Sequence, residues 1–167
     1  TLLADAQAVA REARDRILTA ASAAIQEHGR FRLVVAGGRT PEQTYSLLAE
    51  AESRWGLCEI FFGDERCLPA DHPERNSVLL ERTLVSKVPI PPHRIHPIQA
   101  ELGPEQAADR YQGKVAEALP FDLVLLGMGE DGHTASLFPG HATPEGRLVC
   151  AVHHAPKPPP QRVSLTP

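Results

Sequence analysis

Three short apolar runs, each followed by glycine and then by polar residues, constrain the fold of this chain more than any other feature. They are 31–36 (FRLVVA), 58–62 (CEIFF) and 121–126 (FDLVLL), and helical patterns separate them. Short apolar runs with such boundaries are typical of buried strands. Strands that alternate with helices predict an open, mainly parallel α/β sheet of Rossmann-like type, with helices on both faces.

Two helices carry clear sequence signals, the first at its C-terminal end and the second at its start. Residues 3–25 repeat small and apolar side chains at spacings of three and four, and Gly29 follows as a C-cap. The sequence TPEQ at 40–43 fits the first positions of a helix over 41–54. In this interpretation Thr40 is the N-cap of a capping box and the proline occupies the first helical position.

The remaining elements complete the alternation of helices and strands. Further helices are expected over 75–87 and 104–119, and the strand of 121–126 is expected to be buried near the centre of the sheet. Residues 148–153 (LVCAVH) and 162–166 (RVSLT) are predicted strands. Because the sequence stops after the last of these, we expect it to form an exposed or poorly covered edge.

Length and composition indicate one domain with a small partner. The chain has 167 residues, of which 42% are hydrophobic, and we expect a single domain over 1–167. The net charge is -4 with no block rich in Lys or Arg, which excludes the usual basic surface of nucleic-acid binding. The oligomeric state is left open, with a monomer favoured.

Cysteine use and the terminal segments favour a cytoplasmic protein. Cys58, Cys67 and Cys150 are odd in number and form no CxxC pair, as expected of ordinary thiols in a reducing compartment. No apolar run is long enough to span a bilayer, and the first 16 residues carry acids and bases throughout, unlike a secretory signal.

The run 127–140 (GMGEDGHTASLFPG) is the strongest candidate for chemistry. It follows a predicted strand without a spacer, and ligands of open α/β sheets bind beyond the carboxyl ends of the strands. Glu130, Asp131 and His133 are therefore expected at such a crevice. The alternative is a glycine-rich turn in which Asp131 caps a short helix over 134–138 and His133 is an ordinary surface residue.

A second candidate lies where the first predicted strand meets its helix. Gly37, Gly38, Arg39 and Thr40 combine free backbone N–H groups, the positive end of a helix dipole and a charged donor, which together suit a phosphate. An ordinary strand-to-helix turn would have the same appearance, since neither a Walker nor a dinucleotide pattern is present.

Charged residues also follow the second strand, where Gly63 precedes Asp64, Glu65 and Arg66. We expect these side chains either to be solvated or to point in fixed directions at the edge of the crevice. The eight histidines form no metal-binding pattern such as HExxH, so no metal is expected. No GxSxG motif marks a serine nucleophile, which leaves water as the simplest nucleophile.

Four blocks in this order resemble the 6-phosphogluconolactonases of the pentose phosphate pathway: GGRTPEQTYSLL, FFGDERCLPADHPERN, FDLVLLGMGEDGHTASLFPG and KPPPQRVSLTP. The related glucosamine-6-phosphate isomerases carry DEY and DGHIAFNEP blocks instead. The resemblance implies a NagB-like fold and hydrolysis of 6-phospho-D-glucono-1,5-lactone to 6-phosphogluconate without metal or organic cofactor. It also implies a further C-terminal strand and helix, so part of the domain is expected to be missing.

The resemblance and the chemistry of the residues together assign roles. His133 is expected to be the general base, with Asp131 orienting it. Arg66 would face the lactone carbonyl or the developing oxyanion, and Asp64 would hold Arg66 or a sugar hydroxyl. The residues expected to bind the substrate or its phosphate are Gly37, Gly38, Arg39, Thr40, Asn76 and Gly129.

Two other functions are compatible with the same scaffold. An aldose-ketose isomerase or deaminase, of the glucosamine-6-phosphate type, would use Asp64 and Asp131 for proton transfer. A non-catalytic sugar-phosphate sensor would be accompanied by a DNA-binding segment, and the sequence contains neither a basic helix-turn-helix nor a basic arm.

Overall fold

The structure is a computed structural model that describes residues 2–167. The helices are α1 (Ala6–His28), α2 (Arg39–Ala49), α3 (Asn76–Thr83) and α4 (Pro104–Ala118). The strands are β1 (Phe31–Val35), β2 (Cys58–Phe62), β3 (Asp64–Arg66), β4 (Ile95–His96), β5 (Leu123–Val124), β6 (Val149–Val152) and β7 (Arg162–Leu165). Short 3-10 helices occupy 55–57, 85–87, 92–94 and 100–102. No helix in the described part of the chain is both long and apolar enough to cross a membrane.

The strands form a parallel sheet and a smaller antiparallel one. The first has the order β4-β2-β1-β5 and is parallel throughout, with Leu33 opposite both Ile60 and Leu123. The second has the order β3-β7-β6 and is antiparallel. The mainly parallel α/β sheet predicted from the sequence is thereby confirmed, and the antiparallel sheet extends it.

Strand β7 corrects one expectation, because it is not an edge. It is the middle strand of the antiparallel sheet, paired on one side with β3 and on the other with β6. Its first three side chains are buried. β6 is the strand just before β7 in the chain, but β3 is far away in sequence, so the central position of β7 could not be read from the alternation of residues 162–166 alone.

The run 121–126 also differs from the expectation of a buried central strand. Only Leu123–Val124 form β5, which lies at one end of the parallel sheet's strand order. Val124 is 43% exposed and Leu126 is 67% exposed. The apolar composition of this run predicts burial, but the position in the strand order determines how far the side chains are buried. Among residues 2–167, β5 has only β1 beside it.

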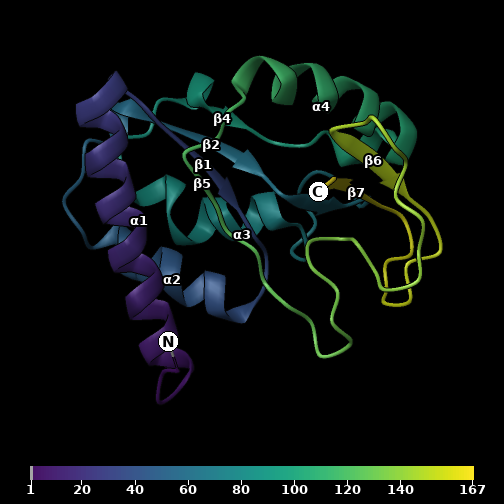
Figure 1. The fold of residues 1–167 in the computed structure, drawn as a ribbon, viewed down its shortest axis with the longest axis horizontal. Helices are drawn as coiled ribbons and strands as arrows, with labels where there is room; N and C mark the ends of the chain where they lie inside the picture. Colours follow the sequence, from purple (N-terminus) through teal and green to yellow (C-terminus); the bar gives the residue numbers. More distant parts are fainter. Residues whose placement is uncertain (1) are drawn as a thin grey trace.

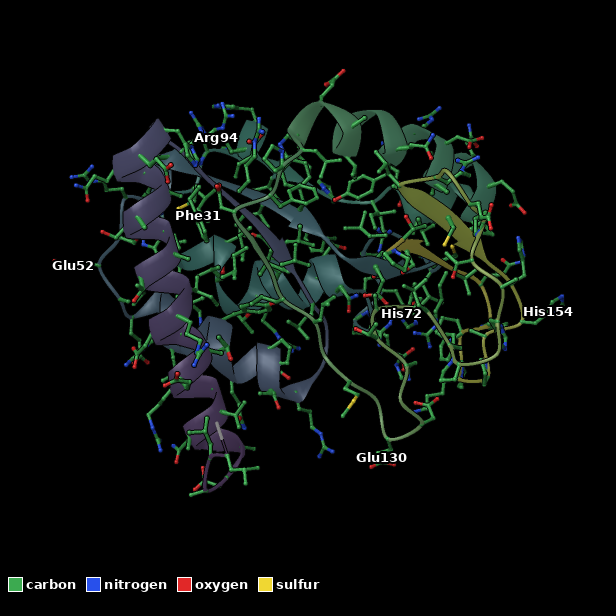
Figure 2. The ribbon with its side chains drawn as sticks, in the orientation of Figure 1. Phe31, Glu52, His72, Arg94, Glu130 and His154 are labelled. Atoms are coloured by element: carbon green, nitrogen blue, oxygen red, sulfur yellow. The ribbon has the colours of Figure 1, made fainter. Side chains whose placement is uncertain are left out.

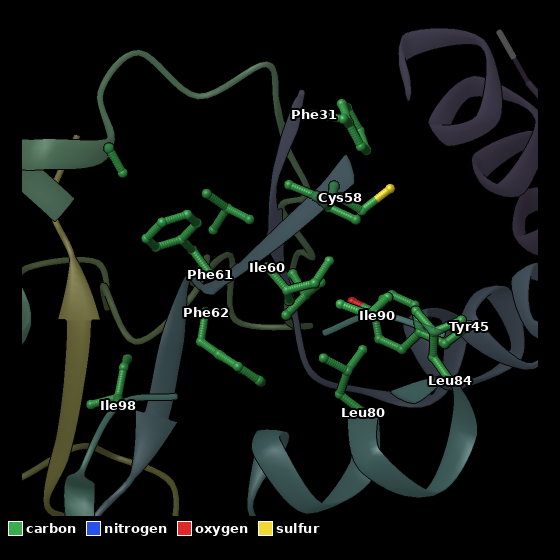
Figure 3. Packing of buried hydrophobic residues seen from close by; sticks show 14 of the residues in the cluster. Phe31, Tyr45, Cys58, Ile60, Phe61, Phe62, Leu80, Leu84, Ile90 and Ile98 are labelled. Carbon is green, nitrogen blue, oxygen red and sulfur yellow. The ribbon is translucent and has the colours of Figure 1, made fainter. Parts of the chain in front are cut away.

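Helices lie on both sides of the sheets (Figure 1). α1 packs on α2, α2 packs on α3, and α4 packs on β6 and β7. Figure 3 shows Ile60 of β2 with Tyr45 of α2 and Leu80 of α3, whereas Phe61 points to the other side of the strand. The alternating side chains of a strand thus bury both faces of the sheet, which explains why β2 is apolar almost throughout.

The helix ends follow the sequence signals in part. Asp5 caps α1 through Ala8 N, and Gly29 ends it in the left-handed region at φ 78°, as predicted for Gly29. The prediction of a capping box with Thr40 as N-cap is wrong. Helix α2 begins at Arg39, with Gly38 as its N-cap at φ 109° and without a side-chain cap. A glycine conformation starts this helix early, so Arg39 and Thr40 lie in its first turn.

Candidate active site

A cleft of about 350 Å³ lies where β1, β3 and the segment after β5 meet. Nearly all of the predicted site residues line it: Gly37, Gly38, Arg39, Thr40, Asp64, Arg66, Asn76, Gly129 and His133. Asp131 does not line the cleft but contacts His133 directly. Arg162, Met128 and Ala135 complete the wall together with Ala36, Pro41 and Gly127.

Glycine at position 37 allows β1 to approach α3 closely. A Cβ atom on Gly37 would overlap the side-chain amide of Asn76. The loop that follows leads into α2, whose first turn contains Arg39 and Thr40. Backbone N–H groups of a first turn have no acceptor within their helix, and the dipole adds positive potential there. This wall of the cleft therefore suits an anionic group.

Glu65 is a structural residue between β3 and α3. Its side chain is fully buried, and Oε1 accepts hydrogen bonds from Arg66 N at 2.9 Å and Asn76 N at 2.8 Å. Oε2 accepts from Ser77 N at 2.9 Å and lies 3.3 Å from Nε of the buried Arg75. Such compensation is what a buried carboxylate requires. Glu65 thus fixes the start of α3, and with it Asn76.

Asp64 is buried in the floor of the cleft. Asn76 Nδ2 donates to its Oδ1 at 2.9 Å, and the Ser136 hydroxyl donates to its Oδ2 at 2.6 Å. Burial raises the pKa of Asp64, against the opposing effects of the Ser136 hydrogen bond and of the charges on Arg66 and Arg162. In the described residues no hydrogen bond or ion pair joins Asp64 to Arg66. One of the two roles foreseen for Asp64, that of holding Arg66 directly, is therefore not seen.

His133 and Asp131 form a hydrogen-bonded pair at the rim. Nδ1 of His133 lies 2.5 Å from Oδ1 of Asp131, and this bond lowers the pKa of Asp131 to about 2. The imidazole stacks on Phe138, with ring centroids 4.7 Å apart. A Cβ on Gly129 would overlap the same imidazole. The ring is thus held from two sides, with Nδ1 occupied by a carboxylate.

The alternative interpretation of this loop as a helix cap does not hold. Residues 134–137 form an isolated bridge between Thr134 and Leu137 instead of a helix, so Asp131 caps nothing there. Ala135 lies in the left-handed region at φ 49°. Glu130, expected near the crevice, sits at the tip of the loop and points away from the body of the protein (Figure 2). The polar residues of this loop therefore diverge in direction.

Two arginines line the cleft in addition to Arg39. Arg66 donates from Nη1 to the carbonyl of Glu74, while its Nε is buried without a hydrogen-bond partner within residues 2–167. Arg162 was not identified from the sequence, although it is only 4% exposed and lines the cleft. The available signal was the alternation of polar Arg162 and Ser164 with apolar Val163 and Leu165, which puts both polar residues on one face of β7. That face meets Asp64 and Arg66 of β3.

Nothing in the described part of the chain groups three or more His, Cys, Asp or Glu residues as a metal site. The thiols of Cys58, Cys67 and Cys150 are free. Burial raises the pKa of Cys58 and of Cys67 to about 11, which disfavours the reactive thiolate. The charged and titratable groups at the cleft are consequently Asp64, the His133–Asp131 pair and the three arginines Arg39, Arg66 and Arg162.

A family model, individual relatives and solved structures all relate this chain to the same protein family. The family model described as glucosamine-6-phosphate isomerases/6-phosphogluconolactonase matches residues 4–167. The 6-phosphogluconolactonase of Streptomyces coelicolor is 37% identical over 182 residues, covering 97% of this chain and 70% of that protein. The 6-phosphogluconolactonase of Rattus norvegicus is 40% identical over 163 residues, covering 88% of this chain and 62% of that protein.

A crystal structure of 6-phosphogluconolactonase from Thermotoga maritima superimposes with a TM-score of 0.91 at 32% identity. The match covers 99% of this chain and 76% of that one. The enzyme from Trypanosoma brucei gives a TM-score of 0.86 at 27% identity, again over 99% of this chain and 75% of the other. The chain therefore spans only part of each of these proteins.

Proposed function

The chain belongs to the glucosamine-6-phosphate isomerase/6-phosphogluconolactonase family, and from this membership we propose that it is a hydrolase of a phosphorylated sugar lactone. The substrate is 6-phospho-D-glucono-1,5-lactone and the product is 6-phosphogluconate. The pairing of His133 with Asp131 at the rim of a cleft that begins at a helix N-terminus is the observation that carries this proposal.

The phosphate of the substrate binds at the start of α2. Arg39 and Thr40 lie in the first turn and line the cleft, and their backbone N–H groups have no acceptor within the helix. Phosphate binding at a helix N-terminus needs no further cation, but the guanidinium adds a charge-assisted contact. Gly37 and Gly38 keep this wall free of side chains, so that the substrate lies against bare backbone.

His133 acts as the general base. Because Nδ1 is occupied by Asp131, Nε2 is the nitrogen that accepts a proton from water. The water oxygen forms a bond to C1 of the lactone, and the proton moves to Nε2. In the collapse of the tetrahedral intermediate the C1–O5 bond breaks, and the imidazolium returns the proton to the ring oxygen. Asp131 stabilises the imidazolium between these two steps.

Arg66 stabilises the oxyanion that forms at C1. Arg66 lines the cleft, and within residues 2–167 only Nη1 of its guanidinium is hydrogen-bonded, to the carbonyl of Glu74, so the guanidinium keeps a donor for a substrate oxygen. Asp64 is held by Asn76 and Ser136, close to Arg66 and Arg162. In this arrangement Asp64 orients a sugar hydroxyl of the substrate, while Asn76 and Gly129 shape the wall on either side.

Proton release from fresh 6-phosphogluconolactone, corrected for spontaneous hydrolysis, tests the proposal. We expect release that is proportional to protein concentration and that His133→Asn suppresses. The same preparation is assayed with glucosamine 6-phosphate, for which formation of ammonia would indicate the isomerase activity instead. Absence of accelerated lactone hydrolysis by a folded protein that binds 6-phosphogluconate would favour a sugar-phosphate sensor.

A further inference from the structure

We propose that Lys157, fixed in place by Arg162, sets the pH at which His133 becomes active by sharing one oxygen of Asp131. The inference rests on the proposed role of His133 as general base. Lys157 and Arg162 are positioning residues in this scheme, since neither transfers the proton.

The shared oxygen is Oδ1 of Asp131. His133 Nδ1 lies 2.5 Å from it, and Lys157 Nζ lies 3.4 Å from the same atom. The aspartate is 37% exposed and the lysine 46% exposed, whereas the imidazole is 17% exposed. The lysine ammonium and the imidazole therefore share one carboxylate oxygen.

Arg162 determines where Lys157 lies. Its Nη2 donates to the carbonyls of Lys157 at 3.1 Å and Pro158 at 3.0 Å, and its Nε donates to the carbonyl of Pro159 at 3.1 Å. Because prolines have no N–H group, few backbone donors of this segment are available to bind its own carbonyl groups, and the guanidinium supplies donors instead. A bond from Ala155 N to the carbonyl of Pro160 closes the loop. A buried guanidinium thus holds three consecutive carbonyls.

Arg162 also lies close to the Phe138 ring that packs against the His133 imidazole. Its guanidinium carbon lies 5.6 Å from the centre of the Phe138 ring, on which His133 stacks. The Nη1 group lies 3.5 Å from the Ser136 hydroxyl that binds Asp64. Arg162 of β7 consequently contacts both the loop that contains Lys157 and the Phe138 ring on which His133 stacks.

The electrostatic consequence has a definite sign. Asp131 favours the protonated imidazole, whereas the positive charge of Lys157 disfavours it and withdraws part of the carboxylate from the ring. The other charged or titratable groups nearby are Arg162, beside Phe138, and His141, whose ring lies 5.9 Å from that of Phe138. Glu130 lies in the same loop, and Asp64, Arg66 and Arg39 line the cleft together with His133. All of these stay unchanged in a variant of Lys157. Removal of the lysine charge should therefore make His133 bind its proton more tightly.

Lys157→Met tests this, with Lys87→Met as the matched control because Lys87 is an exposed lysine in a 3-10 helix outside the cleft. The titration of His133 is followed by NMR of labelled histidine rings, assigned through His133→Asn. The midpoint should move up by about half a pH unit in Lys157→Met, as expected for loss of one charge a few ångströms away in a solvated site. The acid limb of kcat/KM should move with it.

Arg162→Met separates the loop anchor from the charge. It should raise the same midpoint, and Lys157→Met/Arg162→Met should raise it no further than Arg162→Met alone. A midpoint that stays in place or falls in Lys157→Met overturns the proposal, whether or not Arg162→Met folds. Because NMR needs no turnover, the outcomes are distinguishable. A shifted midpoint with unimpaired activity of His133→Asn would remove the general-base role and leave the coupling of Lys157 to Asp131 intact.

Discussion

The hydroxyl of Ser136 donates a 2.6 Å hydrogen bond to Oδ2 of Asp64, although the two residues are 72 positions apart in sequence. Both are buried. The bond joins the loop that carries His133 to the polar end of β2 and β3, so that the two sequence motifs with acidic residues become one site. Hydrogen bonds to charged groups contribute more than those between neutral groups, and an unmet partner in the interior is costly.

Ser136→Ala should therefore lower the free energy of unfolding by about 2 kcal/mol. The control is Ser46→Ala, because the Ser46 hydroxyl donates at 3.1 Å to the neutral carbonyl of Glu42 in a helix, and its loss should cost about 1 kcal/mol or less. Urea unfolding of the three proteins measures both values. Equal losses in the two variants would show that the Asp64 contact has no special weight.

Gly37→Ala should damage the site without removing any polar group. The added methyl would overlap the amide of Asn76, so either the loop or α3 must shift, at about 1 to 3 kcal/mol. Gly56→Ala is the matched control, since a methyl group there would meet no atom within 4 Å and the φ of Gly56 is not in the left-handed range. The midpoint temperature of thermal unfolding and kcat/KM should both fall in Gly37→Ala and stay unchanged in Gly56→Ala. A fully active and stable Gly37→Ala protein would refute the close approach.

Much of the fold was predictable because local signals and global order agree. The apolar runs of β1 and β2, the periodicity of α1 and the left-handed Gly29 all require only neighbouring residues to be recognised. The position of the site beyond the carboxyl ends of the strands follows from the topology of parallel sheets. His133 and Asp131 could be paired in advance because only one residue separates them in the chain.

Most of what was missed depends on contacts between residues far apart in sequence, whereas the start of α2 depends on a local backbone conformation. The burial of Arg162 and the central place of β7 arise from pairing with β3 and β6, which sequence alternation does not encode. Likewise, β5 was expected to be buried because its residues are apolar, yet it lies at the end of the strand order. The early start of α2 depends on Gly38, whose φ of 109° outweighs the favourable capping sequence at Thr40.

Arg39→Ala should weaken substrate binding more than it slows the chemical step. Arg39 is an exposed residue in the first turn of α2 and lines the cleft, so its contact with phosphate would persist from ground state to transition state. Loss of such a charge-assisted bond corresponds to about a 10- to 100-fold increase in KM. Arg30→Ala, an exposed arginine outside the cleft, serves as control. Steady-state kinetics that show an unchanged KM and a collapsed kcat would place Arg39 in the chemistry instead.

His133→Asn should retain the fold and lose rate. Asparagine keeps a polar side chain of similar reach beside Asp131, whereas loss of a general base costs about 10² to 10⁴ in rate. The wild-type kcat/KM should fall on the acid side as the imidazole takes up a proton, and the variant should lack that limb. His141→Asn is the control, because His141 is exposed and faces the same Phe138 ring at 5.9 Å without lining the cleft. A folded His133→Asn protein with wild-type kcat/KM and the same acid limb would transfer the role of base to Asp131 or Asp64, whose raised pKa would then be the next property to measure.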